Sequence, residues 1–322
     1  MNVKNKKIVV IYNGEDWKRD IPFLSVPTRE SFQDWHERGL KNNIEMYRAS
    51  LRWYDMKNNC FKKSWAYRNK RWIKINKSIK PDLIFDKVQG KWDFSLFDKK
   101  MKIMLKVEIF NNPLFRAILD NKLSQYMILS DFMANSYLAN NSDELKKGID
   151  KIKSSKVVLK PLYGSGGFGI IIEEKNKVFN QKINYPIFVQ EFVKSTKGIP
   201  GFSKSEEVSD LRMIFINHKL IYALSRVAKK GSLFTNFHQG AKALLVPEKY
   251  IPVKAKKMAD AIVGKLSIFP KANYSLDFIF TDSGQPILVE MNTTPGFDLL
   301  NIVGDEKIKE KHFKEFISII EK

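Results

Sequence analysis

Two acidic residues near the end of the chain, Asp277 and Glu290, have the types and spacing to bind a metal ion. They lie in two apolar runs joined by the turn-forming segment Asp282–Gln285. If Ser283-Gly284 forms a two-residue hairpin loop, Asp277 lies directly opposite Glu290, and Asn292 shares that face. Neighbouring carboxylates in apolar strands repel each other and are costly to desolvate, and a divalent cation removes both problems. Oxygen ligands suit Mg²⁺ or Mn²⁺, whereas the alternative is a solvated face of a sheet.

A glycine-rich segment supplies a second candidate site. Between residues 164 and 169 four of the six residues are glycines, and Lys160 ends the apolar run before them. Because glycine leaves backbone N–H groups unobstructed, such a loop can fold over phosphate oxygens. The flanking runs predict strand–loop–strand, which differs from the common phosphate-binding fingerprints and suits a flexible lid over a nucleotide. The alternative is a hairpin turn with no ligand. The candidate binding residues of the loop are Gly164, Ser165, Gly166 and Gly167.

A third group combines two arginines with polar loop residues. Asp210 and Arg212 share one face of a predicted strand, and Arg226 ends the next strand. The two arginines could converge on one anion, a task that suits the bidentate guanidinium group. Asn236 and His238 follow in a loop, but no Ser or Cys at triad-like spacing supports a nucleophilic role for any histidine. This group alone is a weak signal, because most arginines of so basic a chain are solvated.

These candidates need strands and helices to position them. Apolar runs bounded by turn residues predict strands at 7–12, 81–85, 156–160, 170–174, 187–193, 211–216, 220–225, 276–280 and 287–291. Helical spacing of apolar residues predicts helices at 29–47, 112–132, 254–266 and 307–320. The alternation is irregular and hairpins come late in the chain, so we predict an α+β or mixed α/β fold.

Composition limits the class of protein. The chain has 322 residues, 43% of them apolar, which predicts about two domains or three small ones and excludes a wholly disordered chain. Its single cysteine, Cys60, excludes an intramolecular disulfide framework and a zinc site built from several thiolates. No apolar run approaches the ~18–20 residues of a membrane span, and the apolar stretch 8–12 is too short for a signal peptide. We expect a soluble cytoplasmic protein.

The net charge of +21 raises the question of a polyanionic partner. Basic residues are spread along the whole chain, so compositional drift explains the charge about as well as nucleic-acid binding does. A long-range attraction of nucleotides or acidic substrates by the positive charge is a simpler hypothesis than a dedicated nucleic-acid site. The segment 48–80 is rich in Trp, Tyr, Arg and Lys, and it could stack single-stranded bases. We favour the simpler interpretation of a strand-rich region with charged edges.

Several of these segments, in this order, resemble the ATP-grasp superfamily. The resemblance runs from about Asn112 to the C-terminus and is closest to the branch of bacterial ribosomal-protein glutamate ligase (RimK-like) and prokaryotic glutathione synthetase. The matching segments are Asp120-Asn121-Lys122-Leu123, Val157–Pro161 with the glycine loop, Phe188–Val193, Asp210-Leu211-Arg212, Asn236–Gly240 and Leu288–Phe297. The last of these, which resembles the metal strand and product loop, is the most specific match.

The resemblance implies a role for each candidate. Lys122 and Lys160 would contact ATP phosphates under the glycine lid. The adenine-binding hinge would comprise Gln190, Glu191, Phe192 and Val193, with Glu191 and the backbone of Val193 at the purine edge. The residues acting on the transferred phosphoryl group would be Arg212, Arg226 and Asn236. The ligands of Mg²⁺ (or Mn²⁺) would be Asp277, Glu290 and Asn292.

The resemblance also implies an architecture and a reaction. It predicts an ATP-grasp fold with an N-terminal α/β domain at 1–110, a central lobe with the lid at 111–190 and a C-terminal lobe with the metal site at 191–322. The activity would be an ATP-dependent ligase that joins a carboxylate to an amine or thiol through an acyl-phosphate. One alternative is ligation onto a peptide or protein tail, for which the basic surface favours an acidic acceptor. Another is a non-catalytic ATP-binding module. A homo-oligomer is expected, and a membrane partner is not.

The sequence departs from the family pattern at positions associated with substrate recognition. Phe234 stands where relatives often carry an arginine, and Gly240-Ala241 replaces a pair of glycines. Ser275 stands where related amino-acid ligases often have an arginine near the first metal aspartate. The stretch Gly198–Glu207 has no counterpart in the family pattern. Nucleotide and metal handling are therefore expected to be retained, while substrate recognition is expected to differ.

Overall fold

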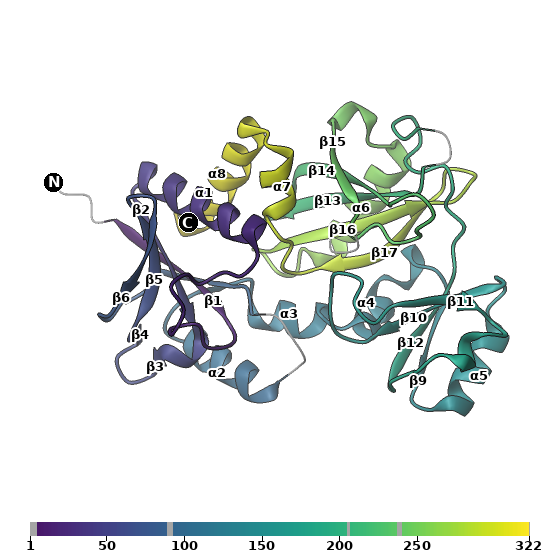
Figure 1. Ribbon diagram of the computed structural model, residues 1–322, viewed down its shortest axis with the longest axis horizontal. Helices are drawn as coiled ribbons and strands as arrows, with labels where there is room; N and C mark the ends of the chain where they lie inside the picture. Colours follow the sequence, from purple (N-terminus) through teal and green to yellow (C-terminus); the bar gives the residue numbers. More distant parts are fainter. Residues whose placement is uncertain (1–4, 89–92, 205–206, 237–239, 322) are drawn as a thin grey trace. The chain divides into compact units, whose positions relative to one another are not determined.

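A computed structural model describes residues 5–88, 93–204, 207–236 and 240–321 (Figure 1). None of the helices in these ranges has the length and apolar content to cross a membrane. The chain forms two compact units. Unit 1 comprises Met1–Arg116, Phe269–Asn273 and Thr294–Lys322, and unit 2 comprises Ala117–Ile268 and Tyr274–Thr293. The expected division into three domains stays a prediction.

Unit 1 is built around a six-stranded sheet in the order β6-β5-β2-β1-β7-β8. The strands across it are β6 (Arg71–Ile75), β5 (Ser64–Arg68), β2 (Ile44–Ser50), β1 (Lys6–Tyr12), β7 (Leu83–Asp86) and β8 (Ile109–Phe110). β2, β1, β7 and β8 run parallel, β5 is antiparallel to β2, and β6 is antiparallel to β5. Ile8–Ile11 of the central β1 are fully buried, as expected for a parallel strand covered on both faces.

Aromatic side chains join α1 (Val26–Lys41) to α8 (Glu306–Glu321) and to Phe297, which precedes α7 (Asp298–Val303). Unit 1 also contains α2 (Phe94–Met104) and a short ribbon of β3 (Tyr54–Asp55) and β4 (Cys60–Phe61). Trp35 of α1 stacks on Phe297 with ring centroids 4.0 Å apart and contacts Phe313 and Phe316 of α8. This contact joins the two ends of the chain within one core.

Unit 2 contains two sheets that are rich in antiparallel strand pairs. The first has the order β11-β10-β12-β9. Its strands are β9 (Ser136–Ala139), β10 (Lys156–Pro161), β11 (Ile171–Glu174) and β12 (Ile187–Glu191). The amphipathic helix α5 (Ser142–Lys151) buries Leu145 and Ile149 in the apolar core on this sheet. Lys160 lies on β10, and Gln190 lies on the neighbouring strand β12.

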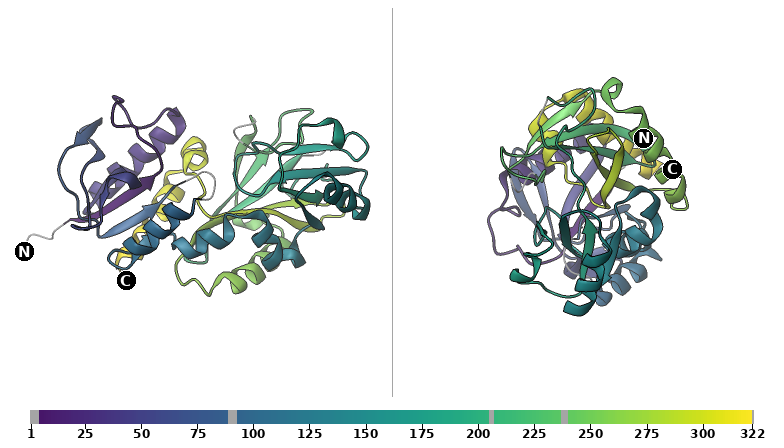
Figure 2. Two further views of the ribbon diagram at one scale, coloured as in Figure 1. Left: turned by 90° about the horizontal axis from the view of Figure 1, so that it is seen from below. Right: turned by 90° about the vertical axis from the view of Figure 1, so that its right-hand side faces the viewer.

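The second sheet of unit 2 has the order β15-β14-β13-β16-β17. Its strands are β13 (Ser209–Ile216), β14 (Lys219–Val227), β15 (Lys242–Val246), β16 (Asn273–Phe280) and β17 (Pro286–Asn292). The helices α4 (Lys122–Leu129) and α6 (Val253–Leu266) both contact β17. The left view of Figure 2 shows both helices below the strands of this sheet. A further helix, α3 (Pro113–Leu119), contains the boundary between the units.

The expected fold class is confirmed, since helices and mixed sheets alternate along the chain. Two predicted helices are wrong in extent: the stretch 112–132 is divided into α3, α4 and a 3-10 turn, and the helix predicted at 29–47 ends early. α1 stops at Lys41, and the chain enters β2 at Ile44. A Cβ on Gly39 would lie 2.9 Å from the Ile44 carbonyl oxygen, so glycine allows the close return of the chain. The turn residue Asn43 has φ of +56°, a conformation that asparagine tolerates.

Candidate nucleotide and metal site

The hairpin β16–β17 places Asp277 opposite Glu290, as predicted. The expected two-residue loop is wrong. Thr281 N–H donates to the Gln285 carbonyl (2.9 Å) and Gly284 N–H donates to the Thr281 carbonyl (2.7 Å), so the loop has three residues, 282–284. Gly284 has φ of +78°, the left-handed conformation that ends such a loop.

A β-bulge at Val289 compensates for the longer loop. Near the turn Phe278 pairs with Leu288, whereas beyond it Asp277 pairs with Glu290, so Val289 is the extra residue of β17. Without the bulge, Glu290 would lie on the opposite face of the sheet, because side chains alternate along a strand. Asp277 and Glu290 both line one cavity.

Asp277 is the centre of a buried ionic network. Arg212 donates from Nε to Oδ1 (2.8 Å) and from Nη2 to Oδ2 (2.6 Å), and Arg226 Nη2 donates to Oδ2 (2.8 Å). Asn292 Nδ2 also donates to Oδ2, at 3.3 Å. Burial raises the pKa of Asp277, but the charges of Arg212 and Arg226 outweigh burial and hold the pKa below its usual range. Arg212 and Arg226 thus converge on a carboxylate of the chain itself, and their expected contact with a bound anion stays a prediction.

Arg226 is also held from its other side. Its Nε donates to Asp210 Oδ1 at 3.0 Å, and its Nη2 donates to Oδ2. The Thr235 hydroxyl donates to the same Asp210 oxygen at 2.6 Å. Asp210 and Arg226 are 3% and 4% exposed, so the pair is sheltered from water. Burial lowers the pKa of Arg226, but Asp210 and Asp277 outweigh it and raise the pKa above its ordinary value.

Lys160, at the end of β10, is a buried cation beside the carboxylates. It is 4% exposed, and its Nζ donates to Gln190 Oε1 (2.7 Å) and to the Val289 carbonyl (3.2 Å). Gln190 is held in turn by Ser136, whose hydroxyl accepts from Nε2 at 3.1 Å. Burial lowers the pKa of Lys160 to about 8; the charge of Glu290 partly opposes this effect, and Lys122 adds a smaller lowering. An added anion here would stabilise the charged amine.

Lys122 reaches the same group from helix α4. The Asn121 side chain caps this helix by accepting from the N–H groups of Leu123 and Ser124, which places Lys122 in its first turn. Lys122 Nζ lies 3.5 Å from Glu290 Oε1 and donates to the Gly164 carbonyl at 2.9 Å. Lys122 therefore connects a metal-ligand candidate to the glycine loop.

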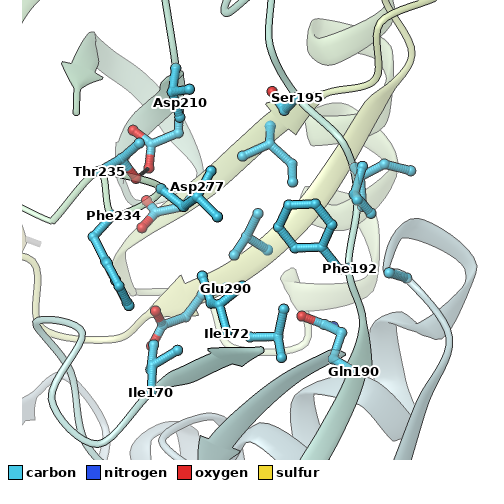
Figure 3. Close-up of a pocket in the computed structure, with 18 of the residues that line it drawn as sticks. Ile170, Ile172, Gln190, Phe192, Ser195, Asp210, Phe234, Thr235, Asp277 and Glu290 are labelled. Atoms are coloured by element: carbon cyan, nitrogen blue, oxygen red, sulfur yellow. Dashed lines mark hydrogen bonds between the residues drawn. The ribbon is translucent and has the colours of Figure 1, made fainter. Parts of the chain in front are cut away.

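The cavity between the two sheets is apolar at one end and charged at the other. Its apolar walls include Val158, Ile170, Ile172, Phe192, Ile279, Ile287 and Leu288. Its charged lining includes Lys160, Asp210, Arg226, Asp277 and Glu290. Figure 3 shows Asp210, Thr235 and Asp277 grouped on one side and Phe192 on the other. An apolar slot that ends in cations and carboxylates suits a flat base with an anionic tail.

The glycine loop approaches this cavity through Gly167. A Cβ on Gly167 would lie 2.7 Å from Asn236 Oδ1, and its φ is +80°, so only glycine fits there without strain. Asn236 lines the cavity. Gly164 and Ser165 are exposed and Gly166 is partly exposed; none of the three lines the cavity. His238 lies outside the described residues.

The predicted hinge residues Gln190, Glu191, Phe192 and Val193 all line the cavity. The Glu191 carboxylate is hydrogen-bonded within the protein. Its Oε1 accepts from the backbone N–H groups of Lys153 and Ser154, both at 3.1 Å. Asn135 Nδ2 donates to the other oxygen at 3.2 Å. The carboxylate thus holds the hinge in place, and its backbone is the better candidate for contact with a base.

A family model described as a RimK-like ATP-grasp domain matches residues 121–311, more than half of the chain. The chain belongs to the RimK-like ATP-grasp family. The resemblance found in the sequence and the expected ATP-grasp fold are thereby confirmed.

The chain also resembles individual proteins and solved structures, at less than 30% sequence identity. A probable alpha-L-glutamate ligase of Shewanella pealeana is 28% identical over 173 residues, 51% of this chain and 33% of that protein. The chain spans a third to a half of the length of such curated relatives. The ATP-grasp ligase PsnB, complexed with a variant of minimal precursor, Mg and ADP, has a TM-score of 0.63 at 13% identity over 99% of this chain and 100% of that chain. A RiPP-associated ATP-grasp ligase of Chryseobacterium gregarium, in complex with ADP and a leader and core peptide, has a TM-score of 0.59 at 14% identity, with coverages of 98% and 97%.

Some residues of this RimK-like site were not among the sequence candidates. The hydroxyl of Thr235 and the carbonyl of Val289 hold Asp210 and Lys160, and no spacing rule singles out either one. In the sequence, the apolar residues that line the cavity, among them Ile170 and Leu288, cannot be distinguished from ordinary core residues. Phe234, the departure from the family pattern, lines the cavity, so it lies where a ligand can contact it.

Proposed function

We propose that the chain is an ATP-dependent ligase that joins a carboxylate to an amine or thiol. The observation that carries the proposal is the cavity itself, in which an apolar slot ends at Lys160, Arg226 and two facing carboxylates. ATP has the matching shape, with a flat base and a polyanionic tail. Membership of the RimK-like ATP-grasp family supports the assignment.

The cations would contact the phosphates, and the base would lie in the slot. Lys160 is already desolvated and hydrogen-bonded, so it needs little reorganisation to contact a phosphate oxygen. Lys122 lies beside it on the Glu290 side. The walls formed by Ile172, Ile279 and Phe192 exclude water from the base, while the backbone around Val193 offers hydrogen bonds to its edge.

The donors around Asp277 fit a magnesium ion. Among the described residues no group of three or more His, Cys, Asp or Glu is placed to hold a metal, but this set has two carboxylates and an amide. Carboxylate and amide oxygens are the ligands that Mg²⁺ prefers, often with phosphates completing the set. Glu290, whose ion pair with Lys122 is long at 3.5 Å, would be the principal ligand, with Asp277 and Asn292 beside it. A bound cation supplies charge neutralisation at the phosphates.

The arginines and the loop have separate roles in the proposed reaction. Arg212 and Arg226 are held by two buried aspartates in fixed orientation, so they can stabilise charge on the transferred phosphoryl group without rearrangement. Asn236 meets Gly167 where the loop would close over the nucleotide. Closure excludes water, which would otherwise hydrolyse the acyl-phosphate before the acceptor attacks.

The acceptor is either a small amine or a peptide. The RiPP-associated neighbour was solved with a leader and core peptide, which supports ligation involving a peptide. The glutamate-ligase relatives support an amino-acid substrate. The departures at Phe234 and Ser275 are consistent with a substrate that differs from those of amino-acid ligases. The homo-oligomeric state stays a prediction.

A turnover assay tests the proposal. The protein is incubated with ATP, Mg²⁺ and pools of amino acids or acidic peptides, and release of ADP and phosphate is followed. We expect release that depends on one of the pools. Tight ATP binding without turnover in every pool would support the non-catalytic module instead.

Replacing Glu290 by Gln tests the metal ligand in the same assay. The substitution keeps the side-chain size and removes the charge, so we expect turnover to be lost. The matched control is Glu248→Gln, an exposed acid of unit 2 outside the cavity. If Glu290→Gln keeps the activity of the control, Glu290 is not a metal ligand.

A further inference from the structure

The most basic part of unit 1 is the segment Lys57–Lys80. It contains nine Lys and Arg residues and no Asp or Glu. Lys62 and Lys63 lie within 4.0 Å of Asp55 and Glu15 outside the segment. Seven of the nine basic side chains are exposed: Lys57, Lys62, Lys70, Arg71, Lys74, Lys77 and Lys80. Within the described ranges, Lys70, Arg71, Lys74 and Lys77 have no ion pair, so this surface attracts an anion.

The hairpin β5–β6 in this segment ends the sheet of unit 1. β6 is the last strand in the order, and Figure 1 shows it at the outer side of this sheet. Asn69 and Lys70 form a two-residue loop with φ of +50° and +59°. The described strands leave one side of β6 without a neighbour, as a template for a further strand.

The hydrogen-bond pattern shows which groups of β6 face outward. In an antiparallel hairpin, only alternate residue pairs exchange backbone hydrogen bonds. Tyr67, opposite Trp72, donates its N–H to His36 Nδ1 (3.2 Å) rather than to β6, so this pair is one of those that do not. The backbone N–H and C=O groups of Trp72, and of Lys74 two residues later, therefore point away from β5.

Most aromatic side chains of the segment are buried and cannot stack on bases, and Trp72 is only partly exposed. Phe61 and Trp65 are 0% and 1% exposed, and the neighbouring Trp53 is 6% exposed. Lys74 lies over Trp65, 5.3 Å from the ring centroid, and Lys63 lies over Trp53 at 4.7 Å. Single-stranded nucleic acid needs exposed aromatic faces, so the structure disfavours that partner.

We propose that β6 is a docking strand for an extended acidic peptide segment. We name the surface formed by Lys70, Arg71, Ile73, Lys74 and Lys77 the basic edge. The peptide would add to the sheet beside Trp72 and Lys74, and its acidic side chains would pair with the cations of the basic edge. Ile73, which is 38% exposed, would give the peptide an apolar contact. The proposal concerns binding and does not depend on the ligase reaction.

A binding assay without nucleotide tests the charge requirement. The full chain is titrated into a fluorescently labelled peptide of alternating glutamate and threonine, and anisotropy is measured. Charge reversal in the triple variant K70E/R71E/K74E is expected to weaken binding by about tenfold or more. The matched control, K146E/K147E/K151E, reverses three exposed lysines on α5 and is expected to bind like the original chain. Equal weakening in both variants would overturn the proposal, as would tighter binding of an oligothymidylate of equal charge.

A second pair of variants tests strand addition. Lys74→Pro removes the outward N–H without breaking a bond to β5, and proline is tolerated on edge strands in that position. Lys74→Ala removes the same charge and keeps the N–H. We expect Lys74→Pro to bind the peptide several-fold more weakly than Lys74→Ala, while both keep the circular dichroism spectrum of the original chain. Equal affinities would overturn the proposal. Turnover with ATP and small amino acids is a separate readout, so failure of docking and failure of the ligase function are distinguishable.

Discussion

At the scale of single residues, buried charges define the candidate site. Asp277, Arg226 and Lys160 are each under 5% exposed, and each has hydrogen-bonded partners. Burying charges is costly unless they are paired, and a network that is fully paired costs less than one left incomplete. The candidates Asp277, Glu290 and Lys160 could be predicted because their charges interrupt apolar runs. Thr235 and the Val289 carbonyl could not, because their contacts depend on how a loop and a bulged strand pack against residues distant in sequence.

Lys160→Met is the residue-scale prediction for the nucleotide site. The substitution keeps much of the side-chain volume beside Gln190 and removes a charged hydrogen-bond donor, so ATP should bind about tenfold to a hundredfold more weakly. Calorimetric titration with Mg-ATP measures the change. Lys156→Met is the control, since Lys156 lies on the same strand and pairs with Glu174 at 3.7 Å. Equal affinity in the two variants would remove Lys160 from the site.

At the scale of elements, the β16–β17 hairpin shows how a correct prediction can rest on an incorrect step. The two-residue loop was wrong by one residue, and the bulge at Val289 shifts the register by one residue in the other direction. The pairing of Asp277 with Glu290 therefore holds. Sequence patterns show apolar runs well but do not show bulges, because an extra residue leaves the composition of a strand unchanged. The short or half-exposed elements β8, β9 and β15 were missed for the related reason that their apolar runs are weak.

Gly284→Ala tests the hairpin. Because Gly284 has a left-handed backbone conformation, alanine should lower the free energy of unfolding by about 1 kcal/mol. Urea unfolding measures the difference. ATP affinity should stay unchanged, since the bulge at Val289 sets the pairing of Asp277 with Glu290. Gly284→Asn should be milder, because asparagine tolerates this conformation. Stability equal to the original chain in the alanine variant would show that the turn has another geometry in solution.

At the scale of the molecule, each unit has its own apolar core. The candidate nucleotide site lies in unit 2, and the basic edge lies in unit 1. Composition predicted two domains or three small ones, and the structure forms two compact units whose segments are discontinuous along the chain. Such interleaving cannot be read from local patterns, because it depends on contacts between residues far apart in sequence. The structure also shows where part of the net charge of +21 lies, because several exposed cations are concentrated at the basic edge of unit 1.

Lys87 links the stability of the fold to pH. Its Nζ donates to the carbonyls of Pro295 (2.7 Å) and Thr294 (3.2 Å), and burial lowers its pKa from 10.5 to about 7. Between these values the unfolded chain binds more protons at Lys87 than the folded chain does, so the free energy of unfolding should rise with pH across this window. Below about pH 7 this gain is absent.

Urea unfolding of the original chain and of Lys87→Met measures this contribution. We expect the original chain to gain stability relative to the variant between about pH 7 and about pH 9. A constant difference between the two proteins over that range would show that Lys87 keeps its ordinary pKa.

A crystal structure with Mn²⁺ and a non-hydrolysable ATP analogue tests the proposed site most directly. Anomalous scattering locates the metal without ambiguity. We predict a manganese ion bound by Glu290 and Asp277 together with the phosphates, and a base between Ile172 and Ile279. A metal ion away from both carboxylates, or a base outside the cavity, would contradict the account.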